Sequence, residues 1–123
     1  MTVKNIPNDS DILGNVIIEG MQDIKAKEIV SINLKELDSA VCDYFIICHG
    51  TSNTHANSIA DKIMEYTINV LKDKPFSKEG LQKSEWILLD YGNIVVHIFQ
   101  KEIRDYYNIE KLWGDGIIER IND

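Results

Sequence analysis

A turn of four residues, Gly50-Thr51-Ser52-Asn53, has the composition and the position to bind an anion. It follows an apolar segment typical of a strand and precedes an expected helix, where free backbone N–H groups attract phosphate. A phosphate loop would need the pattern Gly-x-x-x-x-Gly-Lys-Ser/Thr, and no lysine accompanies this turn. We therefore favour a structural interpretation in which Gly50 makes the turn and Ser52 or Asn53 caps the helix.

Asp90 is the carboxylate best placed for catalysis, because it lies at the end of an expected strand. The residue two positions further on is Gly92, so the second carboxylate of an Asp-x-Asp pair is missing. A single carboxylate cannot hold the two metal ions that nucleotidyl or phosphoryl transfer uses. We expect Asp90 to bond backbone amides of the Tyr91-Gly92 turn instead, and we predict no catalytic centre.

The histidines and cysteines form no recognisable metal-binding or nucleophilic motif. His49, His55 and His97 lack the paired spacing of a zinc site. His97 follows two valines in an expected strand, where it could be inward-facing and hydrogen-bonded. If the chain between Cys42 and Cys48 is extended, their Cα atoms lie roughly 20 Å apart, too far for a disulfide. We expect both cysteines to be reduced, and we predict neither a metal nor a cofactor.

Charge and hydropathy restrict the class of partner. The 123 residues carry a net charge of −7, and the 13 Lys and Arg residues are scattered along the chain. Sequence-specific nucleic-acid binding is not expected, because it needs clustered positive charge. An acidic domain suits a basic partner surface, although the charge could serve solubility alone. No apolar run approaches the ~18 residues of a membrane span and residues 1–10 lack a signal-peptide pattern, so we expect a cytoplasmic protein.

The periodicity of apolar residues predicts one α/β domain over residues 1–123, with its core at about 11–115. Asp9 or Ser10 is expected to cap the first helix. Helices are expected at residues 11–25 and 53–72, with a partly helical segment at 101–113. Strands are expected at residues 28–34, 43–48, 86–90 and 94–99, the last two forming a hairpin. The order αββαββα predicts a mixed β-sheet flanked by helices, followed by a loose tail at 117–123.

Large aromatic residues concentrate in the last third of the chain, at Trp86, Tyr91, Tyr106, Tyr107 and Trp113. Such side chains anchor protein–protein interfaces as well as cores. We expect most of them to be at least half-buried and two or three to lie in an exposed patch of the size that marks a binding site.

Several motifs resemble the ribosomal silencing factor family, also called RsfS or Iojap, and they occur in the right order over about residues 11–115. The hairpin is the most specific of them. In chain order the motifs are Lys25-Ala26-Lys27-Glu28-Ile29, Asp43-Tyr44-Phe45-Ile46-Ile47-Cys48, Gly50-Thr51-Ser52-Asn53, Ile59-Ala60-Asp61, Trp86-Ile87-Leu88-Leu89-Asp90-Tyr91-Gly92-Asn93-Ile94-Val95-Val96-His97-Ile98-Phe99 and Leu112-Trp113-Gly114-Asp115.

The resemblance implies a function that composition could not supply. Members of the family bind the large ribosomal subunit through its protein L fourteen and sterically block joining of the small subunit, which represses translation. They have a nucleotidyltransferase-like fold and tend to form homodimers. Gly50-Thr51-Ser52 keeps a trace of the Gly-Ser of such enzymes, whereas Asp90-Tyr91-Gly92 lacks their second carboxylate. His49 is a departure, because the family more often has a small hydroxyl residue there.

On this basis we predict a partner-binding surface formed by Trp86, Leu88, Asp90, Tyr91 and His97 of the hairpin, with Tyr107 and Trp113 nearby. Apolar anchors would supply affinity, and acidic groups would match a basic ribosomal protein. Two alternatives stay open. One is a metal-dependent nucleotidyltransferase-like enzyme, suggested by the Gly50 turn and Asp90. The other is a ribosome-assembly module without silencing activity.

Overall fold

The computed structural model describes residues 9–121 of the chain. In chain order its elements are α1 (Asp9–Asp23), β1 (Lys27–Asn33), β2 (Tyr44–Gly50), α2 (Asn53–Leu71), β3 (Ser77–Glu79), β4 (Trp86–Asp90), β5 (Ile94–Gln100), α3 (Lys101–Tyr107), α4 (Ile109–Leu112) and β6 (Ile117–Arg120).

The described strands form one mixed sheet in the order β3-β4-β5-β2-β1-β6. The central strands β2 and β5 run parallel, and the other neighbouring strands pair antiparallel. Both central strands are almost wholly buried, as expected when helices cover both faces of a sheet. The predicted mixed α/β sheet flanked by helices is therefore confirmed.

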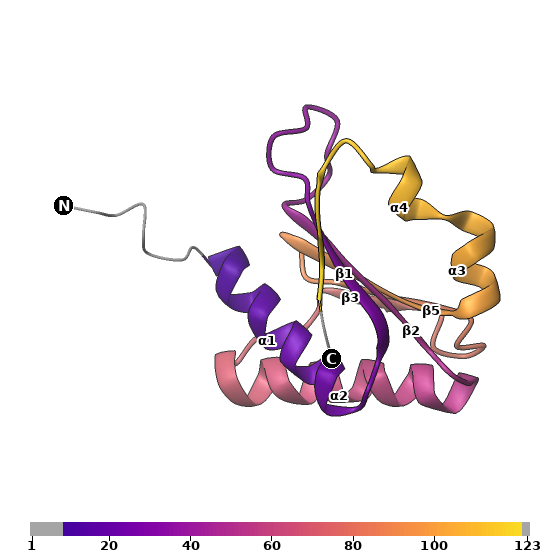
Figure 1. The fold of residues 1–123 in the computed structure, drawn as a ribbon. Coiled ribbons are helices and arrows are strands. Elements are labelled where there is room, and N and C mark those ends of the chain that lie inside the picture. The colour runs from indigo at the N-terminus through magenta and orange to yellow at the C-terminus, as the bar shows by residue number, and fades with distance from the viewer. Residues whose placement is uncertain (1–8, 122–123) are drawn as a thin grey trace.

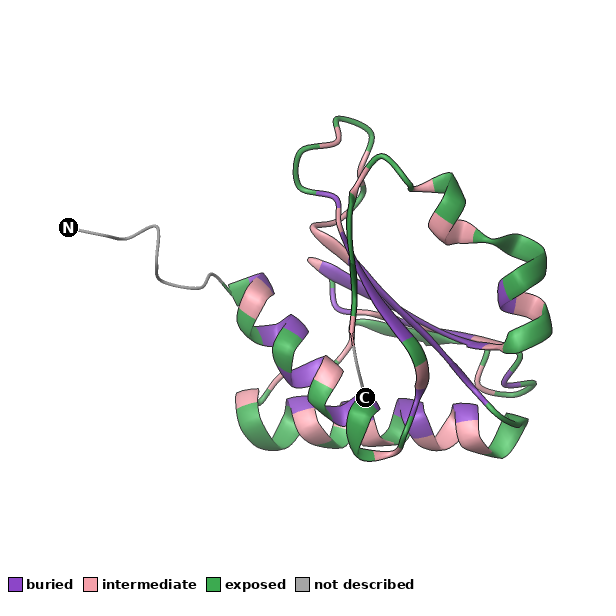
Figure 2. Cartoon of the chain, viewed as in Figure 1, coloured by how far each residue is buried: buried purple, intermediate pink, exposed green. Residues whose placement is uncertain are grey.

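The two faces of the sheet are covered to different extents. Helices α1 and α2 lie side by side on one face and bury an apolar stripe against it (Figure 1). On the other face, α3 packs over β5 and β2, and α3 and α4 remain mostly exposed (Figure 2). The part of this second face that belongs to β4 is therefore only partly covered.

The strand-to-helix turn behaves as its residue types predict. The hydroxyl of Ser52 accepts a hydrogen bond from the backbone N–H of His55 at 3.0 Å, which caps α2. Gly50 lies so close to Ala56 that an added Cβ would meet the backbone nitrogen of that residue at 2.8 Å. A side chain at position 50 would therefore push the helix start away from the strand.

Three expectations about the elements are corrected, and the order αββαββα does not hold. Asp9 and Ser10 lie inside α1 instead of capping it, and the Ser10 hydroxyl donates to the Asp43 carboxylate at 2.6 Å. A short strand, β3, precedes the hairpin. The tail forms β6, which pairs with β1 through residue 120, and Ile121 N–H donates to the carbonyl of Ile29. Residues 122 and 123 lie outside the described residues.

Candidate partner-binding site

Strand β4 divides its side chains between the two faces of the sheet. Ile87 and Leu89 are fully buried beneath α1 and α2, whereas Trp86, Leu88 and Asp90 are half-buried. Successive side chains of a strand point to opposite faces, so these three lie on the face that carries α3 and α4. The hairpin thus presents Trp86 and Leu88 on the incompletely covered side of the sheet.

Two adjoining hollows lie along this side of the sheet. One has a volume of about 390 Å³ and lies between Trp86 and helix α3, and the other, of about 350 Å³, lies over Leu88. We call the combined surface the Trp86 groove; it is lined by Glu79, Gly80, Gln82, Lys83, Glu85, Trp86, Leu88, Ile103 and Tyr107. An apolar floor with a polar rim is typical of a protein-binding site.

The indole of Trp86 is held in place by its neighbours. Its Nε1–H donates to Nδ1 of His97 at 3.1 Å. The ring centroid lies 4.9 Å from that of Phe99 and 5.0 Å from that of Tyr107. The side chain is therefore fixed before a partner arrives, which lowers the entropic cost of using it as an anchor.

His97 supports this floor from below. It is 5% exposed, and burial lowers its pKa to about 4, so the ring is neutral near pH 7. Because Nδ1 accepts from Trp86, the proton lies on Nε2, which has no hydrogen-bond partner among the described residues. His97 faces inward and accepts a hydrogen bond, which is one of the two roles considered for it. The other role, direct contact with a partner, does not fit a side chain that is 5% exposed, so His97 positions Trp86 instead.

Tyr107 and Trp113 lie on the helical side of the same face. Tyr107 is 53% exposed and lines the Trp86 groove, whereas Trp113 is half-buried with its ring edge-on to Phe45 at 5.5 Å. Trp113 lines a separate hollow of about 420 Å³ together with Leu112, which is 76% exposed. Two exposed apolar regions, one at each end of α3–α4, therefore flank the covered centre of the face.

Tyr91 was expected to contact the partner, but this expectation is wrong. Its ring is 5% exposed and lies on the opposite side of the sheet from Trp86. Its hydroxyl and that of Thr67 in α2 are hydrogen-bonded at 3.0 Å, and burial raises the pKa of Tyr91 to about 12. The strand ends at Asp90, so the alternation of β4 no longer determines where the next side chain points. The ring turns towards α2 instead.

Asp90 has the structural role expected of it. Its Oδ1 accepts from the backbone N–H of Gly92 at 2.8 Å, within the hairpin turn. Gly92 has a φ of +87°, a conformation that a side chain would disfavour. Asp90 thus stabilises the turn that joins β4 to β5.

The two features that suggest an enzyme lie at opposite ends of the sheet. Asp90 pairs with Val95, which pairs with Phe45 at the start of β2, whereas Gly50 ends that strand. Gly50 is five residues further along β2 than Phe45, so the Gly50 turn and Asp90 are about 16 Å apart along the strand direction. In the described part of the chain, no three His, Cys, Asp or Glu side chains are grouped so that they could hold a metal ion.

The cysteines are free, as predicted. Cys48 is fully buried and Cys42 is half-buried. Burial raises the pKa of Cys48 to about 12 and that of Cys42 to about 11. Neither thiol is therefore poised as a nucleophile near neutral pH.

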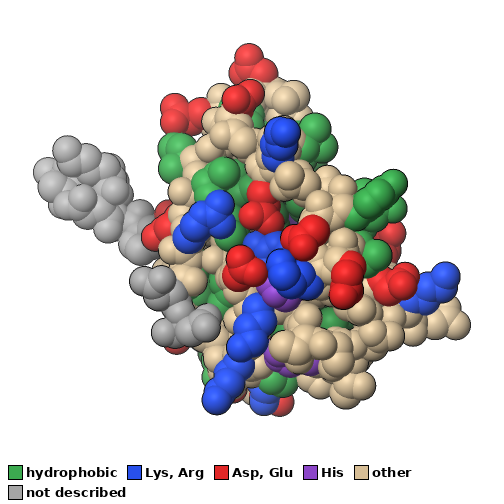
Figure 3. Space-filling view, turned by 45° about the vertical axis from the view of Figure 1, so that its right-hand side comes forward, with side chains coloured by type: hydrophobic (Ala, Val, Ile, Leu, Met, Phe, Trp, Pro, Cys, Tyr) green, Lys and Arg blue, Asp and Glu red, His purple; other side chains and the backbone are tan. Residues whose placement is uncertain are grey.

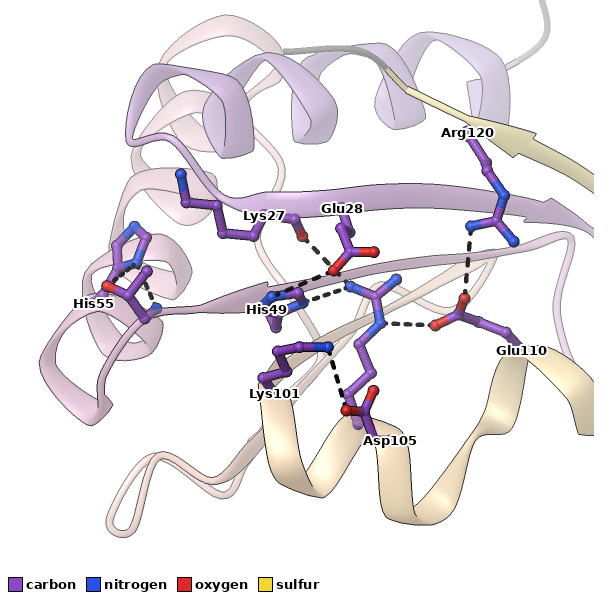
Figure 4. Close-up of polar contacts among 10 residues, drawn as sticks. Lys27, Glu28, His49, His55, Lys101, Asp105, Glu110 and Arg120 are labelled. Atoms are coloured by element: carbon purple, nitrogen blue, oxygen red, sulfur yellow. Dashed lines mark hydrogen bonds and ion pairs between the residues drawn. The ribbon is translucent and has the colours of Figure 1, made fainter.

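An arginine holds the helical wall of the groove against the sheet. Arg104 of α3 is 7% exposed and donates to Glu110 of α4 at 2.7 Å and to Nδ1 of His49 at 2.9 Å. Figure 4 shows His49 and Glu110 on opposite sides of this contact. Ile103 and Tyr107 are one helical turn apart and both line the groove, so docking of α3 sets the position of its wall.

Sequence reasoning missed Ile103 and the segment from Glu79 to Glu85, which form two walls of the groove. The spacing of Ile103 and Tyr107, four residues apart, is a signal that could have indicated a shared helical face.

Acidic and basic side chains lie next to one another near the centre of the space-filling view, with hydrophobic side chains towards its right-hand edge (Figure 3). None of the described helices is both long and apolar enough to span a membrane.

Comparison with known proteins identifies the family. Residues 7–123 match the family model described as "Ribosomal silencing factor during starvation". The chain is 39% identical over 113 residues to the ribosomal silencing factor of Bacillus subtilis, covering 89% of this chain and 90% of that one. It is also 34% identical over 73 residues to a Mus musculus protein named "Mitochondrial assembly of ribosomal large subunit protein 1", covering 58% and 32% of the two chains.

A crystal structure agrees with these sequence matches. The structure of protein CV0518 from Chromobacterium violaceum superimposes with a TM-score of 0.78 at 33% sequence identity, covering 84% of each chain. The fold, the motif order and the extent of the sequence matches lead to one assignment: this chain belongs to the ribosomal silencing factor family.

Proposed function

We propose that this protein binds the large ribosomal subunit through the Trp86 groove and blocks joining of the small subunit by steric exclusion. The observation that carries the proposal is the partial exposure of Trp86 and Leu88 beside Tyr107, on the side of the sheet that α3 leaves open. A fixed, half-exposed tryptophan between apolar neighbours is typical of an interface hot spot.

The partner we propose is ribosomal protein L fourteen, which the family resemblance implies. The net charge of −7 supports a basic partner, because opposite charges accelerate encounter and favour the correct orientation. Glu79 and Glu85 lie on the rim of the groove, where they would face such a surface. We further propose a cytoplasmic protein that forms a homodimer when it is not bound to a ribosome.

Co-sedimentation with purified large subunits tests the proposed surface. Trp86→Ala should abolish co-sedimentation, because it removes the central anchor. Phe76→Ala is the matched control, since Phe76 is 84% exposed and does not line the groove. Thermal unfolding of both variants establishes that they are folded. Undiminished co-sedimentation of a folded Trp86→Ala variant would show that the groove is not the contact.

A role in ribosome assembly is the second candidate, and the name of the mouse relative is the observation that favours it. An assembly module would bind immature large subunits and would leave the joining of mature subunits unchanged. A silencing factor would inhibit that joining directly. The two functions therefore differ in an assay that contains only mature subunits and the purified protein.

A further inference from the structure

A histidine and an arginine that are far apart in sequence meet where α3 contacts the sheet. His49, near the end of β2, is 5% exposed, and Arg104 is 7% exposed. The terminal nitrogen Nη1 of Arg104 lies 2.9 Å from Nδ1 of His49. An arginine has only donors and stays protonated, so Nδ1 must accept and the imidazole must be neutral.

The same guanidinium connects α3 to two other elements. Its Nε donates to Glu110 Oε1 in α4 at 2.7 Å, and a terminal N–H donates to the carbonyl of Lys27 in β1 at 3.4 Å. Figure 4 shows the side chain of Glu110 pointing towards this contact from the helix and His49 approaching it from the strand. Arg104 therefore docks the α3–α4 pair on the sheet, with His49 as its acceptor on β2.

The other charges around His49 come from β1 and α3. Glu28 Oε2 lies 3.8 Å from Nε2 of His49, but the Glu28 side chain is 65% exposed and therefore screened by solvent. Lys101 and Asp105 of α3 pair with each other at 3.2 Å. Burial, followed by the charge of Arg104, lowers the pKa of His49 despite the opposing effect of Glu28.

We propose that His49 is an acid-sensitive latch, and that its protonation breaks the bond to Arg104 and loosens α3–α4 from the sheet. A protonated ring has no free acceptor and places a second cation beside a buried guanidinium. The latch is a property of the isolated protein and does not depend on ribosome binding. Its consequence for the Trp86 groove, whose wall includes Ile103 and Tyr107, rests on the proposed function.

Two substitutions separate the latch from ordinary packing. In His49→Asn, the side-chain oxygen can take the place of Nδ1 and accept from Arg104 without titrating. In His49→Ala, the acceptor is absent at every pH. His97 still titrates in both variants, so any loosening that originates at His97 would appear in all three proteins.

Native-state amide hydrogen exchange of residues 101–112, corrected for intrinsic rates and compared with residues 53–71, tests the latch at pH 7.5 and pH 5. Relative to residues 53–71, which report the His97 effect that all three proteins share, protection of residues 101–112 in the wild type should fall roughly tenfold at pH 5. On the same relative scale, the Asn variant should stay protected at both pH values, and the Ala variant should be weakly protected at both. Unchanged wild-type protection, or an equal loss in the Asn variant, would overturn the proposal. Ribosomes are absent from this measurement, so its outcome is independent of the proposed function.

Discussion

The indole N–H of Trp86 and Nδ1 of His97 are joined by a hydrogen bond of 3.1 Å across the hairpin. The half-exposed ring is the anchor of the groove, and the buried ring beneath it must be neutral to accept this bond. Protonation of His97 therefore disturbs both the core and the surface that we propose to contact the ribosome.

Acidification should destabilise the protein through His97. Its pKa is about 4 in the folded state, below its ordinary value of 6.5, so the unfolded state binds more protons between these values. The contribution of neutral His97 to the free energy of unfolding should be fully present above pH 6.5. It should decrease as the pH falls towards 4, by about 2 kcal/mol at pH 5. Urea unfolding of the wild type and His97→Gln measures this difference. An identical pH dependence in both proteins would contradict the assignment.

Tyr91→Phe should cost stability without affecting partner binding. The substitution removes the buried hydrogen bond to Thr67, with an expected loss of about 1 kcal/mol in the free energy of unfolding. A double-mutant cycle with Thr67→Val isolates that bond, and large-subunit co-sedimentation should be unchanged. Loss of co-sedimentation by a folded Tyr91→Phe protein would mean that this ring does take part in the contact.

Asp90 should matter for the turn and not for nucleotide binding. Asp90→Ala removes the acceptor for Gly92 N–H and should destabilise the protein by about 1 kcal/mol, whereas Asp90→Asn keeps an acceptor oxygen. Calorimetry with Mg²⁺ and ATP or CTP should show no binding to the wild type. Micromolar binding that disappears in Asp90→Ala would support the enzymatic alternative.

The adjacent tyrosines of α3 offer a matched pair for mapping the groove. Tyr107 lines the groove and contacts Trp86, whereas Tyr106 is 80% exposed and lines neither hollow of the groove. Tyr107→Ala should weaken large-subunit affinity roughly tenfold, and Tyr106→Ala should change it little. Fluorescence anisotropy of labelled protein titrated with large subunits gives both affinities. Equal losses would place the contact elsewhere on α3.

Local patterns predicted most of the elements because the residue types within each of these elements favour the conformation that it adopts. The hairpin around Gly92 and the capping of α2 by Ser52 follow from residue types at fixed positions, and both are observed. Strand β6 could not be predicted in this way. Its residues 117–120 do not alternate in polarity, and the strand forms because the edge of β1 offers it hydrogen-bond partners.

The groove that we propose as the site was predictable in part. Residue types singled out Trp86 and Leu88, which both line the groove, but the exposed side of β4 depends on where α3 lies, and a position in space cannot be read from periodicity. Tyr91 was misplaced because its side chain follows the end of a strand. The His49–Arg104 contact joins residues 55 positions apart, and no local pattern indicates it.

The most direct test of the central claim is the rate of subunit joining, followed by light scattering after mature small and large subunits are mixed. Wild-type protein and Phe76→Ala, added first to the large subunits, should both inhibit joining in proportion to their concentration. Trp86→Ala should leave joining at its uninhibited rate. Normal joining in the presence of saturating wild-type protein would contradict steric silencing, and full inhibition by Trp86→Ala would contradict the role of the Trp86 groove.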